Sequence, residues 1–299
     1  MEKEKIDALI RSLDREIVKE QKGAEKELSL VRLKEIAKVY RGEDKVIPFS
    51  EVVARIKLSV DDIKIFTGWA KLDELLKGFR LQQLVVVSAL TKSGKTSWLM
   101  DMSTRLEQYN PIWFSFEQSV DELVSICLER GQEPPKAFTP ESLMGNTVEW
   151  VESKIVESIA KYDTKIVFID HLDFIVPMEG NNHHLMIAKT MRELKGLAKK
   201  WNILIFIVCH LQKAKMDTQP TLEDLRGSSS IGQECDTAIL LWREMKKEGG
   251  QVVITNNVNV SVQASRRYGS TGNVKMVYDK GLFTEQEWET EAQLALKEF

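Results

Sequence analysis

The spacing of hydrophobic residues along the chain changes near residue 60. Upstream, apolar residues recur at helical spacing among charged ones, first within 6–17 and again within 27–40. Such spacing is typical of amphipathic helices with one apolar stripe, which needs a partner surface. Residues 1–60 are therefore predicted to form a helical appendage and linker.

Downstream, short apolar runs alternate with amphipathic helical segments. Residues 257–268 and 273–285 instead alternate apolar and polar side chains and are separated by turn residues, which predicts a hairpin at a sheet edge. The preceding runs are apolar on both faces, as strands are when helices cover both sides of a parallel sheet. These runs are 84–90, 111–117, 165–176, 203–211 and 236–244.

The predicted fold class is therefore α/β, with a mainly parallel sheet flanked by helices. One domain is expected over residues 61–285, followed by a C-terminal tail over 286–299.

Composition limits the class of protein but does not name a partner. The 299 residues are 43% hydrophobic and carry a net charge of −3, so the average charge neither indicates nor excludes nucleic-acid binding. The three cysteines are far apart and lack the paired spacing of a zinc site or a disulfide framework, so a reducing compartment is expected. The N-terminus lacks a secretion signal and no segment is long and apolar enough to span a bilayer, which predicts a soluble protein with no membrane partner.

The segment "LVVVSALTKSGKTSWLMDMSTRL" reads as a strand, a loop of small residues and a helix. In that context backbone N–H groups and the helix N-terminus bind phosphates, Lys95 supplies a mobile positive charge, and the Thr96 hydroxyl ligates magnesium. A chance match in a surface turn is the alternative, and the flanking strand and helix argue against it. The predicted nucleotide contacts are Ala89, Thr91, Lys92, Ser93, Gly94, Lys95, Thr96 and Ser97.

Ala89 stands where the general phosphate-loop pattern has glycine. Alanine adds one methyl group and fits that position if its φ is negative. The substitution is therefore expected to be tolerated.

Polar side chains end three of the predicted strands. Asp170 follows four apolar residues and is expected to hold magnesium at the carboxyl end of its strand, where open α/β sheets bind ligands. Glu117 is a candidate to orient the attacking water, and His210 a candidate to contact the γ-phosphate. Taken singly, a solvated carboxylate and an ordinary loop histidine are the commoner explanations. His183 and His184 lack ligand-type neighbours at metal spacing, so they are interpreted as exposed loop residues.

These pieces occur in an order that resembles the hexameric replicative helicases of the DnaB family and the helicase half of phage primase-helicases. The segments that carry the resemblance are "FTGWAKLDELLKGFRLQQLVVVSALTKSGKTSW", "WFSFEQSVDEL", "IVFIDHLDFI", "LKGLAKKWNILIFIVCHLQK" and "PTLEDLRGSSSIGQECDTAILLWRE". Alanine commonly opens the phosphate loop in that family. The resemblance implies a RecA-like ATPase core in which Glu117 is the catalytic glutamate, Asp170 the magnesium carboxylate, and His210 and Gln233 the sensors.

The segment "QASRRYGSTGNVKM" resembles the family segment whose lysine and arginine reach the γ-phosphate of the neighbouring subunit. Here Ser265 takes the lysine position and Arg267 matches the arginine. The resemblance therefore implies Arg267 as the arginine finger, with Arg266 as its helper or substitute. Which of the two arginines acts stays open at this point.

The family contacts DNA through channel loops, one of which corresponds to "QKAKMDTQPTLEDLRGSSS". Flexible cations and hydroxyl groups bind a nucleic-acid backbone without reading its sequence. A solvated polar loop is the alternative for each residue. The expected DNA contacts are Lys213, Lys215, Arg226, Ser228 and Ser229.

The resemblance implies an ATP-dependent ring helicase that translocates on single-stranded DNA, with ATP and Mg²⁺ as cofactors. It implies assembly with further copies of the chain into a hexamer, a separate primase, polymerase or loader as partner, and a bacterial, phage-infected or organellar setting. A RecA-like recombination or regulatory ATPase without unwinding activity is the alternative. An inactive ring subunit or loader is a third class, and the presence of Glu117 and Asp170 argues against it.

Overall fold

The computed structural model describes residues 47–58, 63–90, 93–177, 183–211, 219–225, 228–248 and 251–286. The chain divides into two compact units, Met1–Val60 and Asp61–Phe299. The described part of the first unit contains helix α3 (Phe49–Leu58), on which Phe49 and Val53 are exposed. The predicted stripes within 6–17 and 27–40, and the tail beyond residue 286, lie outside the described residues.

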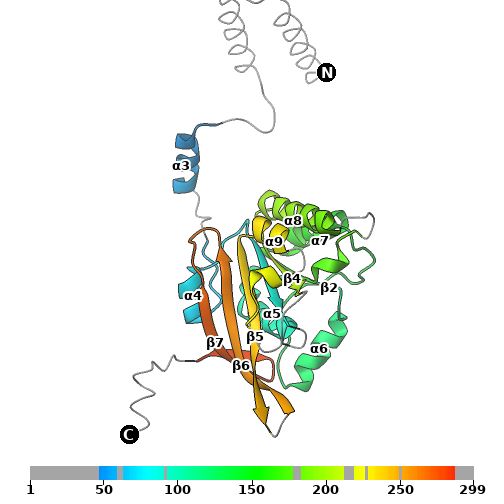
Figure 1. Ribbon diagram of the computed structural model, residues 1–299. Helices are drawn as coiled ribbons and strands as arrows, with labels where there is room; N and C mark the ends of the chain where they lie inside the picture. The colour runs from blue at the N-terminus through cyan, green and yellow to red at the C-terminus, as the bar shows by residue number, and fades with distance from the viewer. Residues whose placement is uncertain are drawn as a thin grey trace, which may run out of the picture. The chain divides into compact units, whose positions relative to one another are not determined.

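An eight-stranded sheet forms the centre of the second unit (Figure 1). Its strands run in the order β2-β3-β4-β1-β5-β6-β7-β8. They are β1 (Leu84–Ala89), β2 (Ile112–Ser115), β3 (Ile166–Asp170), β4 (Leu204–His210), β5 (Thr237–Glu248), β6 (Gln251–Ser265), β7 (Gly272–Asp279) and β8 (Leu282–Glu285).

The five strands from β2 to β5 pair in parallel, with β1 between β4 and β5. All residues of β1, β2 and β3 are buried, which is why their sequences are apolar without alternation. Since parallel strands point the same way, the carboxyl ends of β1, β3 and β4 meet at one edge of the sheet. Ala89, Asp170 and His210 are the last residues of these strands.

The remaining pairings, β5 with β6, β6 with β7 and β7 with β8, are antiparallel. The predicted edge hairpin corresponds to β6 and β7. The segment expected as its second arm forms two strands, because Lys280 and Gly281 adopt positive φ values of 47° and 109° and turn the chain. Strands β5 and β6 are 12 and 15 residues long, longer than the predicted runs, and extend beyond the sheet as a two-stranded ribbon (Figure 1).

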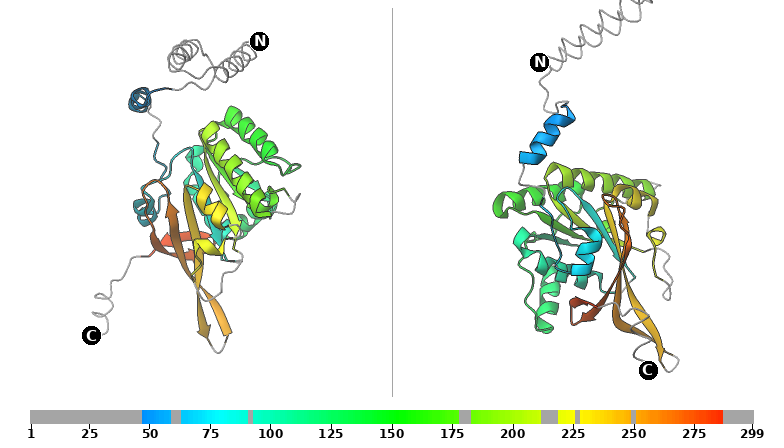
Figure 2. Two further views of the ribbon diagram at one scale, coloured as in Figure 1. Left: turned by 45° about the horizontal axis from the view of Figure 1, so that its top comes forward. Right: turned by 90° about the vertical axis from the view of Figure 1, so that its left-hand side faces the viewer.

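Helices cover both faces of the sheet, as Figure 2 shows from two further directions. On one face Val85 and Val87 share a buried cluster with Trp98 and Leu99 of α5, and on the other Val86 clusters with apolar residues of α7, α8 and α9. The helices of this unit are α4 (Ala70–Leu76), α5 (Lys95–Arg105), α6 (Val120–Glu129), α7 (Val148–Tyr162), α8 (His183–Lys200) and α9 (Ser228–Glu234). Short 3₁₀ turns are η1 (Glu107–Tyr109), η2 (Leu172–Phe174) and η3 (Leu222–Asp224).

The carboxylate of Asp73 holds the turn near the start of the second unit. Asp73 accepts hydrogen bonds from the backbone N–H and hydroxyl of Thr67, at 2.8 and 2.9 Å, and from the N–H of Gly68 at 2.9 Å. These bonds close the turn that leads into α4. They explain why a Thr-Gly pair and an aspartate lie at this spacing.

Two predictions of local structure were wrong. His183 and His184 begin α8 and are not in a loop, although both side chains are exposed as expected. Ser228 and Ser229 lie in the first turn of α9, so the predicted DNA loop ends before them. In both cases the polar residues form the first turn of a helix and not the end of a loop.

Among the described residues, every helix is too short or too polar to cross a bilayer.

Candidate active site

The phosphate loop leaves the parallel part of the sheet and enters a helix directly. Ala89 ends β1 and is buried, and the non-glycine residues with positive φ in the described part of the chain do not include it. Alanine is therefore compatible with this position, as expected. Gly94 precedes α5 with φ 86°, a conformation that L side chains rarely adopt. Thr91 and Lys92 lie outside the described residues.

Lys95 is buried at the first turn of α5. Desolvation lowers the pKa of its ammonium group, and the charges of Asp170 and Glu117 act in the opposite direction. The three charged groups therefore belong to one site. A buried ammonium paired with carboxylates is ready to exchange them for the oxygens of a phosphate.

Asp170 contacts helix α5 and is almost completely buried. Its Oδ2 accepts a hydrogen bond from Thr96 Oγ1 at 2.8 Å, whereas its Oδ1 has no hydrogen-bond partner in the described part of the chain. Burial raises the pKa of this carboxyl, and the Thr96 hydrogen bond lowers it. A hydroxyl and a carboxylate with a free buried oxygen fit the oxygen ligands that Mg²⁺ prefers. Thr96 and Asp170 thus lie together, as a shared magnesium site requires.

Glu117 follows the end of the neighbouring strand, β2. The N–H groups of Phe116 and Glu117 donate to the carbonyl oxygen of Asp170, at 2.7 and 3.4 Å. The Glu117 side chain is 48% exposed. Its backbone is therefore fixed to the strand that carries Asp170 while its carboxylate reaches solvent, as an activating carboxylate requires.

His210 meets a second histidine that the sequence motifs did not single out. Its ring centroid lies 4.0 Å from that of His171 in an edge-to-face arrangement. His171 Nε2 lies 4.0 Å from Glu117 Oε2, and its Nδ1 accepts from the N–H of Asp173 at 3.3 Å. Burial is the main reason that the pKa of His171 falls to about 4, so the ring is neutral at pH 7. The sequence feature that could have identified His171 is its position directly after Asp170, at the end of a predicted strand.

The arginine candidates lie on the turn between β6 and β7, and both are exposed. Arg266 makes two contacts within its own chain. Its guanidinium donates to the carbonyl oxygen of Gln233 in α9, and its backbone N–H donates to the carbonyl oxygen of Asp236 at 2.7 Å. Arg267 lies with its guanidinium carbon 5.8 Å from the ring centroid of Tyr268. Both arginines thus lie on the surface and contact their own chain, Arg266 at α9 and Arg267 at Tyr268.

The predicted DNA contacts are only partly visible. Lys213, Lys215 and Arg226 lie outside the described residues, and the structure describes the backbone of Ser228 and Ser229 but not their side chains. Lys213 and Lys215 belong to the segment 212–224, which follows Leu211, and Arg226 lies just beyond its end. An isolated antiparallel bridge between Leu211 and Leu225 closes its base.

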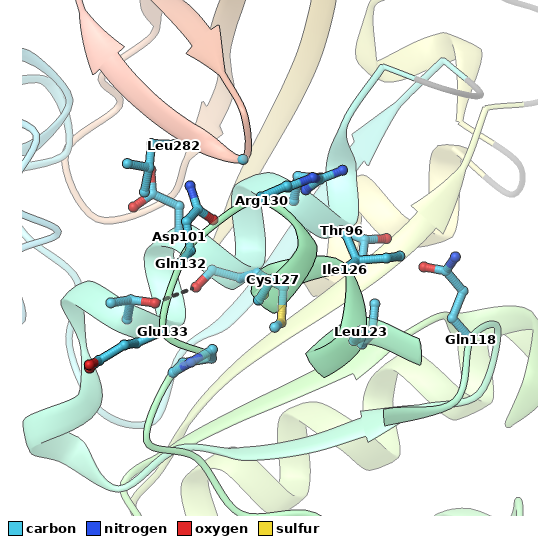
Figure 3. Close-up of a pocket in the computed structure, with 15 residues that line it drawn as sticks. Thr96, Asp101, Gln118, Leu123, Ile126, Cys127, Arg130, Gln132, Glu133 and Leu282 are labelled. Carbon is cyan, nitrogen blue, oxygen red and sulfur yellow. Dashed lines mark hydrogen bonds between the residues drawn. The ribbon is translucent and has the colours of Figure 1, made fainter. Parts of the chain in front are cut away.

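A pocket of about 450 Å³ adjoins the phosphate loop (Figure 3). Its lining includes Thr96 and Ser97 of α5, Arg130 directly after α6, and Leu282 at the start of β8, and Arg130 Nη1 lies 3.5 Å from Ser97 Oγ. Its lining is mixed, with apolar side chains such as Leu123 beside amides and charged groups. A pocket of this size and composition suits a planar ring with a polar rim.

Family comparison agrees with this geometry. The family model described as "DnaB-like helicase C terminal domain" matches residues 64–134 and 139–285. The chain belongs to this family. The predicted family and the predicted α/β fold are thereby confirmed.

Curated relatives of this DnaB-like domain are longer than the chain. It is 25% identical over 253 residues to the replicative DNA helicase DnaB of Mycoplasma genitalium, an alignment that covers 70% of this chain and 53% of the relative. It is also 25% identical over 298 residues to the DnaB of Rickettsia felis, covering 78% of this chain and 60% of that protein. The chain thus spans about half to three-fifths of the length of these relatives.

Solved structures show the same fold as this DnaB-like domain. A DnaB-like replicative helicase, described with its interactions with primase, superposes with a TM-score of 0.66 at 19% identity and covers 95% of this chain and 77% of that chain. An isolated ATPase domain gives a TM-score of 0.65 at 20% identity and covers 80% of this chain and 97% of that chain.

Proposed function

We propose that this chain is an ATP-driven DNA helicase that moves along single-stranded DNA and separates duplex DNA during replication. The observation that carries the proposal is the convergence of Lys95, Asp170 and Glu117 at one edge of the parallel sheet in a DnaB-like domain. Glu117 is anchored by its backbone and its carboxylate reaches solvent, as a group that activates water requires.

ATP is the proposed nucleotide, with its phosphates on the loop before α5. Lys95 and the first N–H groups of α5 bind the phosphate oxygens, and the adjoining pocket takes the base and ribose. Thr96 and Asp170 would hold Mg²⁺, which neutralises phosphate charge when bound. Gly94, Ser93 and Ser97 complete the cradle, together with the predicted residues Thr91 and Lys92.

Hydrolysis requires a water molecule in line with the γ-phosphate. Glu117 orients this water and accepts its proton as the oxygen attacks phosphorus and the bond to the bridging oxygen breaks, which yields ADP and inorganic phosphate. His210 donates a hydrogen bond to the γ-phosphate and loses that partner when phosphate leaves. His171, between Glu117 and His210, keeps the two groups at fixed positions.

A second subunit completes the site. Both arginines are exposed, but the guanidinium of Arg266 bonds to α9 whereas that of Arg267 contacts the neighbouring Tyr268 of the same turn, so we assign the arginine finger to Arg267 and a positioning role to Arg266. An arginine that stabilises charge on the transferred phosphoryl group is worth about 10³ to 10⁵ in rate. A finger supplied from the next subunit implies head-to-tail assembly. A closed hexameric ring is the form that we propose.

Phosphate loss is passed to DNA through the segment that starts after His210. Because the Leu211–Leu225 bridge ties the base of this segment to the sensor strand, a shift of His210 moves its cations. Gln233 in α9 provides a second sensor through the contact of its backbone with Arg266. The proposed phosphate-backbone contacts are Lys213, Lys215, Arg226, Ser228 and Ser229.

Partners outside the ring are proposed from the family alone. A separate primase, polymerase or loader would act with this chain in the cytoplasm of a bacterial or phage-infected cell. One solved DnaB-like helicase is described with its interactions with primase, which supports primase as the first partner to test.

Strand displacement tests the proposal directly. Purified protein is expected to hydrolyse ATP faster with single-stranded DNA and to displace a strand from a duplex with a 5′ tail, and Lys95→Ala is expected to do neither. ATP hydrolysis that DNA stimulates without displacement would favour a RecA-like recombination or regulatory ATPase.

A further inference from the structure

Three potential metal ligands from three separate segments meet beside the phosphate loop. Glu117 follows β2, His171 follows β3, and His210 ends β4. One ligand atom of each lies within 4.8 Å of those of the other two. The parallel sheet produces this meeting, since all three strands deliver their carboxyl ends to the same edge.

We propose that Glu117, His171 and His210 form a binding site for a transition-metal ion of the Zn²⁺ class. Two imidazoles and one carboxylate form the ligand set of open zinc sites, in which a water molecule takes the fourth position. Tetrahedral coordination with bonds of ~2.0–2.1 Å places ligand atoms about 3.3 Å apart. The ligand atoms lie within 4.8 Å of one another, so the cluster has to contract to reach that spacing, and the half-exposed Glu117 side chain has room to approach the histidines.

The surroundings of His171 allow it to bind a metal through Nε2 after a change of tautomer. Its ring packs against Phe174 at a centroid distance of 4.8 Å, and its side chain is only 9% exposed. Its Nε2 is the atom that faces Glu117, and a metal bound there leaves the ring hydrogen on Nδ1. Asp173 Oδ2 lies 3.8 Å from Nδ1, so a small shift lets this carboxylate accept that hydrogen in place of the 3.3 Å contact with the Asp173 N–H.

This site differs in chemistry from the proposed magnesium site. Thr96 and Asp170 offer oxygen atoms only, which Mg²⁺ prefers, whereas imidazole nitrogen selects Zn²⁺ and related ions. The ammonium of Lys95 faces the charges of both Asp170 and Glu117, so two carboxylates act on one lysine. The excess of negative charge attracts a divalent ion to the cluster.

If the proposed function holds, a metal ion bound to this cluster affects ATP hydrolysis. A metal-bound Glu117 carboxylate cannot accept a proton from water, and a metal-bound His210 cannot donate to phosphate. Transition-metal ions are therefore expected to inhibit ATP hydrolysis, and the cluster would act as a brake on the same site.

Binding is measured first without nucleotide, so that it does not depend on ATPase activity. Co²⁺ titrated into the full chain is expected to give the visible absorption of a low-coordinate site, and Zn²⁺ is expected to displace it. His171→Ala should weaken Zn²⁺ binding by at least ~10-fold. The matched control is His184→Ala, which removes an exposed histidine of α8 and should leave the affinity unchanged. Circular dichroism verifies that both variants are folded.

Equal Zn²⁺ affinity in the two variants, or a Co²⁺ spectrum identical to that of the hydrated ion, would overturn the metal site. ATP hydrolysis at saturating Mg²⁺ is then measured against added Zn²⁺. Inhibition that is lost in His171→Ala and kept in His184→Ala supports the brake. Zn²⁺ binding without inhibition would overturn the brake alone, and a chain that binds Zn²⁺ but never hydrolyses ATP would overturn the proposed function instead.

Discussion

Two regions of the molecule carry candidate catalytic charge, and they present it in opposite ways. In the parallel half of the sheet, Lys95 and Asp170 are buried and act on each other. In the antiparallel half, Arg266 and Arg267 stand exposed on the turn between β6 and β7. The charges of the first region are buried and interact with one another, and those of the second are exposed to solvent.

This contrast indicates which part of the site one subunit makes by itself. Lys95 and Asp170 are buried with charged partners in their own chain, although desolvation has the larger influence on both pKa values. An exposed arginine gains little from its own chain and is available to a neighbour. Arg266 is the informative intermediate, because its side chain returns to the carbonyl oxygen of Gln233 whereas that of Arg267 stays beside Tyr268.

The sharpest test of this contrast is Arg267→Ala. We expect ATP hydrolysis to fall by about 10³-fold or more, because the transferred phosphoryl group loses its stabilising cation. Nucleotide binding should change little. Steady-state hydrolysis and fluorescent-nucleotide binding measure the two effects.

Mixing subunits reveals where the arginine acts. Arg267→Ala subunits mixed with Lys95→Ala subunits should recover part of the activity, because an intact pocket then meets an intact finger. Full-speed turnover by Arg267→Ala, or by a monomer, would show that the exposed region is not part of the site.

Glu117→Gln tests the site at the parallel half of the sheet. Because glutamine cannot accept the proton of water, hydrolysis should drop by about 10²- to 10⁴-fold while ATP still binds. Single-turnover kinetics separates the chemical step from binding. Each variant is then mixed with Lys95→Ala subunits, and ATP hydrolysis is measured. Only Arg267→Ala should restore activity, because Glu117→Gln and Lys95→Ala both damage the pocket. Equal activity of the two mixtures would contradict the contrast.

Phe283→Ala tests how firmly the two regions are joined. Phe283 is fully buried, and its N–H donates to Asp101 of α5 at 2.7 Å while its carbonyl oxygen accepts from Trp69 Nε1 at 2.8 Å. Truncation of a buried phenylalanine costs about 3 kcal/mol of unfolding free energy. Chemical denaturation should show one transition at lower denaturant. Two separate transitions would mean that the regions unfold independently.

The last test concerns pH. The pKa of His171 lies at about 4 in the folded protein and at 6.5 ordinarily, so the unfolded chain binds more protons between these values. Its contribution to stability is therefore present above pH 6.5 and is lost as the pH falls towards 4. His171→Gln, which cannot titrate, should lose less unfolding free energy than the wild type over this window. Parallel pH profiles of the two proteins would contradict the assignment.

Local sequence predicted much of this molecule. Fully apolar runs predicted the parallel strands and hence the α/β class, because a strand buried on both faces cannot alternate. Strand ends located Asp170, and a strand, loop and helix located Lys95 and Thr96. Their roles, with those of Glu117, His210 and Arg267, stay predictions until the experiments above are made.

Tertiary structure decided what lies next to what. His171 became a candidate only when the sheet brought it against Glu117 and His210, because the three residues come from separate strands and have no common local pattern. Likewise, Arg266 and Arg267 are adjacent and chemically identical in the sequence. The position of α9 beside their turn distinguishes them, since it offers a carbonyl oxygen to the guanidinium of Arg266. Sequence thus determined which groups end each strand, and the packing of distant segments determined which of them meet.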